Sequence, residues 1–275
     1  MIFVHFIVYI SFGVSITMNR ITLNNCNFVG KYRDIREKLD YTFHENYTEE
    51  RQLFQDTLID QIISNYTDNN SNNKNKSNNR KDNSDGQREL IYTAGAMGAG
   101  KTHTLRFLDK EGWLGLDNFF MIDPDRFREM LPEYQHMKQT DRLNAAAFFH
   151  KESCILSEIT FRFGCMQGYN IISDGSMSNT EWYIDEIKMI RELYPHYRIT
   201  IIYVEADWER IVDRVDSRCK ITGRCINKNK LRSVWSKVPE SVGILKNYVD
   251  RYCHVVNNDN PPRIVEEYVI GDGGV

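Results

Sequence analysis

An eight-residue segment, Gly95-Ala96-Met97-Gly98-Ala99-Gly100-Lys101-Thr102, matches the pattern G-x-x-x-x-G-K-T at every fixed position. An apolar run precedes it and a helix-like run follows it, so the backbone N–H groups of the loop and the helix N-terminus can surround an anion. In such a loop Lys101 reaches the β- and γ-phosphates of a nucleotide, and the hydroxyl of Thr102 binds Mg²⁺. A glycine-rich turn that binds nothing is the alternative, but the flanking pattern favours nucleotide binding. The candidate nucleotide-binding residues are Gly95, Ala96, Met97, Gly98, Ala99, Gly100, Lys101, Thr102 and His103.

Two carboxylates, Asp123 and Asp125, stand at the end of the next apolar run, with Pro124 between them. Ligands of open α/β sheets bind at the carboxyl ends of the strands. A carboxylate in that place can accept the proton of an attacking hydroxyl, so Asp125 or Asp123 is a general-base candidate. Asp125 would alternatively cap a helix that begins at Arg126, but capping accounts for one carboxylate and not for both.

A further carboxylate, Asp174, ends the third apolar run and is followed by Gly175. In nucleotide-binding sheets a carboxylate in this position orients a Mg²⁺-bound water. An Asp-Gly pair is also a common turn at the end of a strand. Together with the phosphate loop, the pattern favours Asp174 and Thr102 as the Mg²⁺ site.

Three arginines, Arg210, Arg214 and Arg218, follow the fourth apolar run at intervals of four residues, and Arg224 comes directly after Gly223. This spacing places the three on one helix face, and the glycine suggests a mobile lid. Such arginines can neutralise charge that develops on a transferred phosphoryl group. A solvated helix face paired with acidic neighbours is the alternative, and it best explains Arg210. We predict Arg218 and Arg224, together with Lys101 and Asp125, as the catalytic residues.

Apolar runs alternate with helical stretches from Glu89 onward, which predicts an α/β fold with a parallel sheet and crossover helices. The predicted strands are residues 90–94, 119–123, 170–174, 199–205 and 253–258. The predicted helices are residues 101–108, 142–164, 179–193, 208–217 and 242–252.

The part of the chain before the sheet divides into three segments. Residues 1–17 are apolar, and we consider Met18 as the true start, an uncleaved membrane anchor, or a cleaved signal peptide. Residues 18–64 show a helical pattern that includes an amphipathic helix. Residues 65–87 are rich in Asn, Ser, Lys and Asp and predict a disordered insert without a binding role. Residues 88–275 then form the predicted catalytic domain.

Composition limits the classes of partner and compartment. The chain of 275 residues carries 35 basic and 38 acidic residues, so no strong field attracts it to nucleic acid or to an anionic membrane. Its 6 cysteines are dispersed, without a CxxC pair or a metal-ligand spacing. We therefore expect free thiols in a reducing, cytoplasmic compartment, with membrane anchoring only if residues 1–17 are a real anchor.

Several segments occur in fixed order between Glu89 and Ile226: GAMGAGKT, MIDPDRFREMLPEY, HKESCILSE, GYNIISDGSMSN and RCKITGR. Through them the chain resembles the zeta toxin family of P-loop kinases over about half of its length. The resemblance implies a P-loop NTPase/kinase-type parallel sheet flanked by helices, and an ATP- and Mg²⁺-dependent kinase of a small molecule. It implies that Asp125 is the base, that Lys101 binds the phosphates, and that Arg218 and Arg224 are the transition-state arginines.

Within the resemblance, Asp123, Glu152 and Glu158 are the candidate substrate-binding acids. Six residues separate Glu152 from Glu158, which places them about 120° apart on a helix, so both do not easily face one cleft. Bacterial toxins of the family resemble kinases of UDP-N-acetylglucosamine held by an antitoxin. This chain differs in its N-terminal region, in its Asn-rich insert, which favours a eukaryotic source, and in Cys225-Ile226, where the family commonly has Val-Pro. A nucleotide sugar is thus one candidate acceptor, and the resemblance assigns no antitoxin-like partner.

We accordingly expect an ATP-dependent kinase whose partners are ATP and a small molecule with an acceptor hydroxyl. One alternative is a non-catalytic nucleotide-binding or interaction protein that docks a partner through its amphipathic helix. Another is a polynucleotide or nucleoside kinase, which would need a basic groove with base-stacking aromatic side chains. The nearly balanced charge argues against nucleic acid as a partner.

Overall fold

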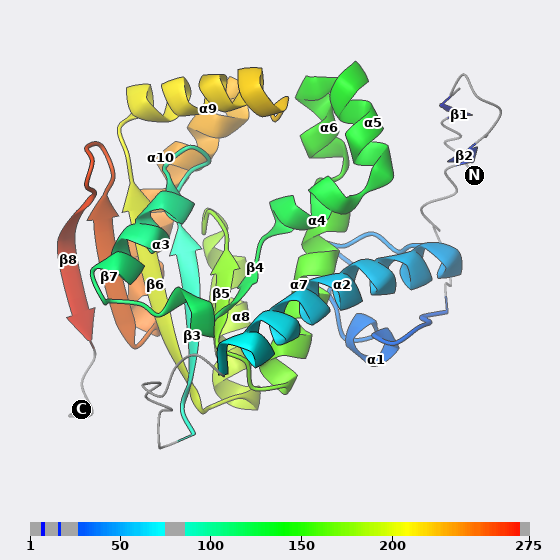
Figure 1. Cartoon of the computed structure of the whole chain (residues 1–275), viewed down its shortest axis with the longest axis horizontal. Coiled ribbons are helices and arrows are strands. Elements are labelled where there is room, and N and C mark those ends of the chain that lie inside the picture. Colours follow the sequence, from blue (N-terminus) through cyan, green and yellow to red (C-terminus); the bar gives the residue numbers. More distant parts are fainter. Residues whose placement is uncertain (1–6, 9–15, 18–26, 75–85, 270–275) are drawn as a thin grey trace.

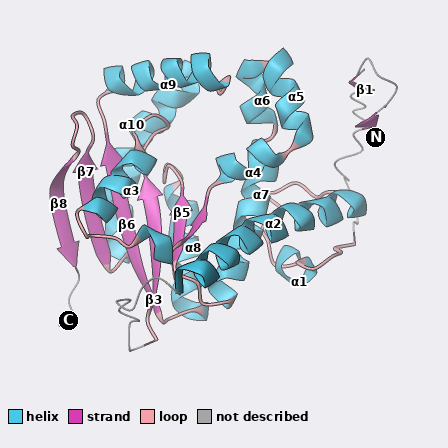
Figure 2. Ribbon diagram, in the orientation of Figure 1, coloured by secondary structure: helices cyan, strands magenta, loops and turns pink. Residues whose placement is uncertain are grey.

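A computed structural model describes residues 7–8, 16–17, 27–74 and 86–269 of the chain (Figure 1). Six strands form one sheet in the order β4-β5-β3-β6-β7-β8, in which all neighbours are parallel except β7 and β8. Figure 2 shows helices on both faces of this sheet. The predicted α/β fold with a parallel sheet is confirmed.

The strands of this sheet are β3 (Arg88–Ala94), β4 (Phe120–Ile122), β5 (Ile171–Asp174), β6 (Tyr197–Glu205), β7 (Arg251–Val256) and β8 (Arg263–Val269). A separate antiparallel pair consists of β1 (Ile7–Val8) and β2 (Ile16–Thr17). The helices are α1 (Arg33–Arg36), α2 (Glu49–Lys74), α3 (Lys101–Lys110), α4 (Pro124–Met130), α5 (Pro132–Thr140), α6 (Arg142–Phe148), α7 (His150–Met166), α8 (Thr180–Leu193), α9 (Trp208–Thr222) and α10 (Lys228–Leu245). Two short 3-10 helices are η1 (Leu116–Asn118) and η2 (Lys246–Tyr248).

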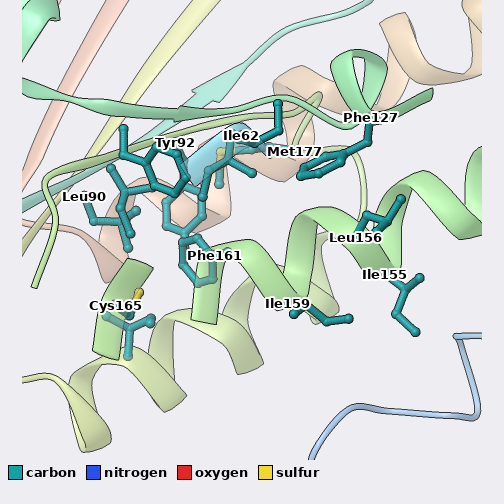
Figure 3. Close-up of a cluster of buried hydrophobic side chains, with 14 of the residues drawn as sticks. Ile62, Leu90, Tyr92, Phe127, Ile155, Leu156, Ile159, Phe161, Cys165 and Met177 are labelled. Atoms are coloured by element: carbon teal, nitrogen blue, oxygen red, sulfur yellow. The ribbon is translucent and has the colours of Figure 1, made fainter. Parts of the chain in front are cut away.

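Alternating residues of the central strands build two hydrophobic clusters, one on each face of the sheet. Leu90 and Tyr92 of β3 point to the cluster that contains residues of α7 and α8, whereas Ile91 points to the cluster with α3 and α9. Successive side chains of a strand point to opposite faces, so a strand that is apolar at every position is covered on both sides. Figure 3 shows Leu90 and Tyr92 packed with Phe161 of α7.

The N-terminal helices share the first of these clusters. Ile59 and Ile62 of α2 are buried in it, and Ile62 lies beside the sheet residues in Figure 3. The helix continues past Ser64 to Lys74, ten residues into the segment for which composition predicts disorder. Tyr66 provides a physical reason, because its ring packs 4.8 Å from that of Phe120 between centroids. The prediction for residues 1–17 lies largely outside the described residues.

Other boundaries differ from the predicted ones. The segment predicted as one helix over 142–164 forms two helices, which are separated at Phe149. The buried ring of Phe149 packs against Tyr134. The helix predicted over 242–252 has the wrong bounds, since α10 begins at Lys228, passes through Pro239 and ends at Leu245, before β7. The sequence pattern also missed α4, α5 and the antiparallel edge strand β8. No helix in the described ranges is both long enough and apolar enough to cross a membrane.

Candidate active site

The carboxyl ends of β3, β4 and β5 lie at one edge of the sheet and bring the predicted residues together. Thr93 of β3 is in register with Asp174 of β5, and Ile122 of β4 is in register with Ser173. The phosphate loop follows β3, and Asp123 follows β4. The parallel register therefore places the loop and the two acidic strand ends side by side, as the sequence predicts.

The phosphate loop turns into α3 through a left-handed residue, Gly100, which has φ +91° and precedes the first helical residue. A Cβ at Gly100 would collide with the side chain of Asn257, so only glycine fits this turn. Lys101 lies at the start of the helix, and its Nζ donates to the carbonyl of Gly95 over 3.2 Å. This hydrogen bond keeps the lysine side chain folded back onto the first residue of the loop.

Two residues hold this loop by hydrogen bonds: Asn257, which the sequence pattern did not single out, and Arg214, which it placed on the arginine face of the following helix. Asn257 Nδ2 donates to the Ala99 carbonyl at 2.7 Å, and Arg214 Nη1 donates to the same oxygen at 3.2 Å. Arg214 Nη2 also donates to the carbonyl of Asn257 at 2.8 Å. Asn257 follows the carboxyl end of β7, so the rule that found Asp123 and Asp174 would also have found it.

Asp174 is held next to the phosphate loop by its neighbours. Its Oδ1 accepts a hydrogen bond from Thr93 Oγ1 at 2.5 Å and lies 3.9 Å from Lys101 Nζ. Thr93 Oγ1 in turn accepts from the N–H of Gly175 at 3.2 Å. Mg²⁺ prefers oxygen ligands and is usually held by one or two carboxylates together with substrate phosphates and water. The carboxylate of Asp174 and the exposed hydroxyl of Thr102 are ligands of this kind.

Asp123, and not Asp125, caps the helix that follows β4. Its Oδ1 accepts the N–H of Asp125 at 2.8 Å, and Pro124 is the first residue of α4. The alternative that Asp125 caps a helix starting at Arg126 is therefore wrong. Burial raises the pKa of Asp123 to about 6, and the nearby carboxylates of Asp174 and Asp125 add to this shift. Three acidic groups thus face one another at this edge.

Asp125 points into a group of cations. It forms ion pairs with Arg224 and, over 3.0 Å, with Nη2 of Arg128. Burial by itself raises the pKa of Asp125, but Arg128, Arg224 and Arg218 outweigh it and hold the pKa below its usual value. Asp125 is therefore ionised at neutral pH. Arg128 was missed by the sequence pattern, although it lies one helical turn after Asp125.

The two predicted lid arginines lie near each other at the end of α9. Burial lowers the pKa of Arg218, and the positive charge of Arg224 lowers it further. Among the described residues, nothing hydrogen-bonds the buried Nε of Arg218. The chain reverses at Gly223, and a disulfide joins Cys219 to Cys225 across this turn. The expectation of free thiols is therefore wrong for this pair, because the turn brings two cysteines separated by 6 positions into contact.

A hollow of about 580 Å³ opens beside the phosphate loop. It is lined by Gly100, His103, Arg210, Arg214 and residues 257–260. His103, which the sequence predicts as a nucleotide-binding residue, thus lies at its wall. Arg210 also lies there, whereas the sequence pattern assigned it to a solvated helix face.

Glu152 and Glu158 point toward the N-terminal segment. Glu152 is fully buried and accepts from Nε of Arg51 at 2.5 Å. Glu158 Oε2 lies 2.7 Å from Nε2 of His44, and its Oε1 accepts from Arg162. Their described contacts tie α7 to the N-terminal segment, and their substrate-binding role stays a prediction.

Comparison with known proteins assigns this chain to a family. The sequence profile of the zeta toxin family matches residues 73–267, well over half of the chain. A search of curated proteins finds no significant match.

Solved structures share the fold. One from the PezAT chromosomal toxin-antitoxin system of Streptococcus pneumoniae has a TM-score of 0.59 and 17% identity, covering 77% of this chain and 81% of that chain. The AvrRxo1-ORF1:-ORF2 complex with ATP has a TM-score of 0.56 and 16% identity, covering 84% of this chain and 70% of that chain. Together the profile and the fold support a P-loop kinase-like phosphotransferase, and the chain belongs to the zeta toxin family.

Proposed function

We propose that this protein transfers the γ-phosphate of ATP to a hydroxyl group of a small molecule, with nucleotide sugars among the candidate acceptors. The observation that carries this proposal is the convergence at one sheet edge of Lys101, Asp174, Asp125 and the two lid arginines. A nucleotide-binding protein without transfer activity needs the first two residues. Such a protein does not require a carboxylate surrounded by arginines, like Asp125, next to Lys101 and Asp174.

The nucleotide would lie with its phosphates on the loop and its base and ribose in the hollow beside His103. Lys101 would contact the β- and γ-phosphates. Thr102 and Asp174 would hold Mg²⁺, which when bound neutralises charge on those phosphates. The guanidinium groups of Arg218 and Arg224 would contact the phosphoryl group in transfer.

Asp125 is the better base of the two acidic candidates. One carboxylate oxygen of Asp123 is engaged in capping α4. Asp125 lies among the arginines that would receive the phosphoryl group, and it stays ionised at neutral pH because its pKa is lowered. Ion pairing with Arg224 must loosen when the acceptor hydroxyl arrives, since that hydroxyl donates its proton to the same carboxylate.

A screen of ATP with a pooled metabolite library tests the function. Mass spectrometry should find one class of compound with an added phosphate when the wild-type protein is present. Asp125→Asn should lower this transfer by about 10²- to 10⁴-fold while ATP binding persists, because a general base contributes about that much. Asp117→Asn, an exposed aspartate outside the site, is the matched control and should keep the wild-type rate.

Two results would contradict the proposal. Full turnover by Asp125→Asn would show that Asp125 is not the general base. Binding of ATP by the wild-type protein without consumption of ATP or modification of any compound would favour the non-catalytic alternative.

A further inference from the structure

The disulfide between Cys219 and Cys225 encloses the lid turn, and each cysteine directly follows a lid arginine. Arg218 precedes Cys219 in the last turn of α9, and Arg224 precedes Cys225 beyond the turn at Gly223. The Cα atoms of the two cysteines are 4.4 Å apart. The bond therefore holds the two segments that carry the arginines at a short distance.

Two like charges lie close together at this place. Arg224 lowers the pKa of Arg218, which shows that the two guanidinium groups repel each other, and the buried Nε of Arg218 has no hydrogen-bond partner among the described residues. Asp125 offsets part of this repulsion, since its carboxylate raises the pKa of Arg218 and pairs with Arg224, but it does not hydrogen-bond the buried Nε. A covalent link next to both arginines opposes their separation until a phosphoryl group neutralises them.

The bond does little to connect distant parts of the fold. Its cysteines are separated by only 6 positions, and disulfides that close long loops constrain the unfolded chain most. Disulfides in reducing compartments are mostly transient and are used in catalysis or redox sensing. The disulfide between Cys219 and Cys225 lies at the lid and not in the core, which fits a role in controlling the conformation of the lid.

We propose that Cys219 and Cys225 are a redox modification site that controls phosphoryl transfer, in which the disulfide keeps Arg218 and Arg224 together in the cleft and the dithiol lets them separate. This inference rests on the proposed function for its effect on rate. Its effect on the conformation of the lid does not depend on any transfer activity.

The co-reactant would be a low-molecular-weight disulfide. Cys219 is half-buried and Cys225 is 8% exposed, so the thiolate of Cys219 is the first to attack. It forms a mixed disulfide and expels one thiolate, and the thiolate of Cys225 then attacks the Cys219 sulfur and expels the second. The two cysteines lose two electrons and two protons, and the reagent becomes two thiols. Cationic neighbours, including Lys220, favour the thiolate that this exchange needs.

The test compares the wild-type protein equilibrated with oxidised or with reduced glutathione, with the state of the cysteines read by alkylation and mass spectrometry. With the acceptor found in the metabolite screen, kcat should be about tenfold higher in the disulfide form, and KM for ATP should change little, because only the alignment of the arginines changes. Cys219→Ser and Cys225→Ser should show the lower rate under both conditions. Cys154→Ser, at a half-buried free thiol, should keep the redox response.

Equal rates in the two states of the wild-type protein, or a faster dithiol form, would overturn the proposal. Hydrogen exchange of the amides of residues 218–225 provides a readout that needs no acceptor. Reduction should speed this exchange, and unchanged exchange would overturn the redox site. Faster exchange on reduction, combined with no transfer in either state, would support release of the lid and refute the proposed kinase activity instead.

Discussion

Two clusters of charged side chains differ in how their charges are arranged. Where α2 meets α5 and α7, Arg51 lies between Glu133 and Glu152, at 2.7 Å and 2.5 Å, so that opposite charges alternate. At the carboxyl edge of the sheet, Asp123 faces two other carboxylates and Arg218 faces Arg224. Opposite charges meet in both places, since Asp125 pairs with Arg224 and Arg128, but only the second cluster also brings like charges together.

We interpret this difference as a difference in role: the side chains of the first cluster stabilise the fold, whereas those of the second bind a ligand. Placing like charges together costs free energy, and a chain that folds with such a cluster has reason to keep it only if something from outside neutralises it. The residue types are the same in the two places. We therefore expect substitutions in the first cluster to lower stability and substitutions in the second to lower activity.

Replacing Arg51 tests the first half of this comparison and should have the largest effect. Arg51→Ala removes the cation that bridges Glu133 and the fully buried Glu152, so the free energy of unfolding should fall by about 3–5 kcal/mol. Urea unfolding followed by circular dichroism measures it. Arg33→Ala, which breaks an exposed pair with Glu37, should leave the free energy of unfolding nearly unchanged. Equal, small losses in both variants would mean that the buried cluster does not hold α2 in place.

Replacing Arg218 tests the other half. Arg218→Ala should lower kcat by about 10²- to 10³-fold, as expected when a group that stabilises transition-state charge is removed. Its free energy of unfolding should not fall, because the substitution relieves repulsion with Arg224. Steady-state kinetics measures kcat, and urea unfolding of the same preparation measures the free energy of unfolding. A less stable protein with intact kcat would place Arg218 with Arg51 among the structural residues.

Loss of a hydrogen bond that holds the phosphate loop should produce a smaller effect, on nucleotide binding. Asn257→Ala removes the shorter of the two hydrogen bonds to the Ala99 carbonyl, and we expect the Kd for ATP to rise about tenfold as the loop loses its fixed orientation. Isothermal titration calorimetry measures this Kd. Asn247→Ala, which affects an exposed asparagine after α10, should leave it unchanged. Equal affinity in the two variants would show that Arg214 is sufficient to hold the loop.

Glu186 is a third arrangement, a buried carboxyl with a neutral partner. Replacing it should have the smallest effect of the substitutions considered, a change in how the free energy of unfolding depends on pH. Burial raises the pKa of Glu186 from 4.5 to about 8, and Tyr92 donates a hydrogen bond to its Oε1 at 2.7 Å. Because the folded pKa is the higher one, the folded state binds the proton more tightly, and this stability is lost as pH rises from about 4.5 to 8.

Glu186→Gln should therefore flatten the fall in the free energy of unfolding between about pH 5 and pH 8. Urea unfolding at several pH values measures this slope. Glu181→Gln, an exposed glutamate of the same helix, should keep the wild-type slope. A slope unchanged by Glu186→Gln would assign the pH dependence to other groups.

The parts of the fold and the site that were predictable are those encoded by adjacent residues. The apolar runs predicted all five parallel strands of the main sheet within about three residues, because a strand buried on both faces must be apolar throughout. The antiparallel edge strand β8 was missed because it is largely exposed and carries Arg263, Glu266 and Glu267. The start of α10 was missed for a related reason, since its first turn is polar and exposed.

By itself the sequence determined the phosphate loop and the acidic strand ends, because glycine spacing and strand polarity act within a few neighbouring residues. Only the tertiary structure decided which charges meet. Glu152 pairs with Arg51 of the N-terminal helix, and Asn257 reaches back to Ala99. Cys219 meets Cys225 because the chain reverses at Gly223. Helical spacing indicates the face on which a side chain lies, but its partner depends on how the helices pack, and that is settled by the core of the whole molecule.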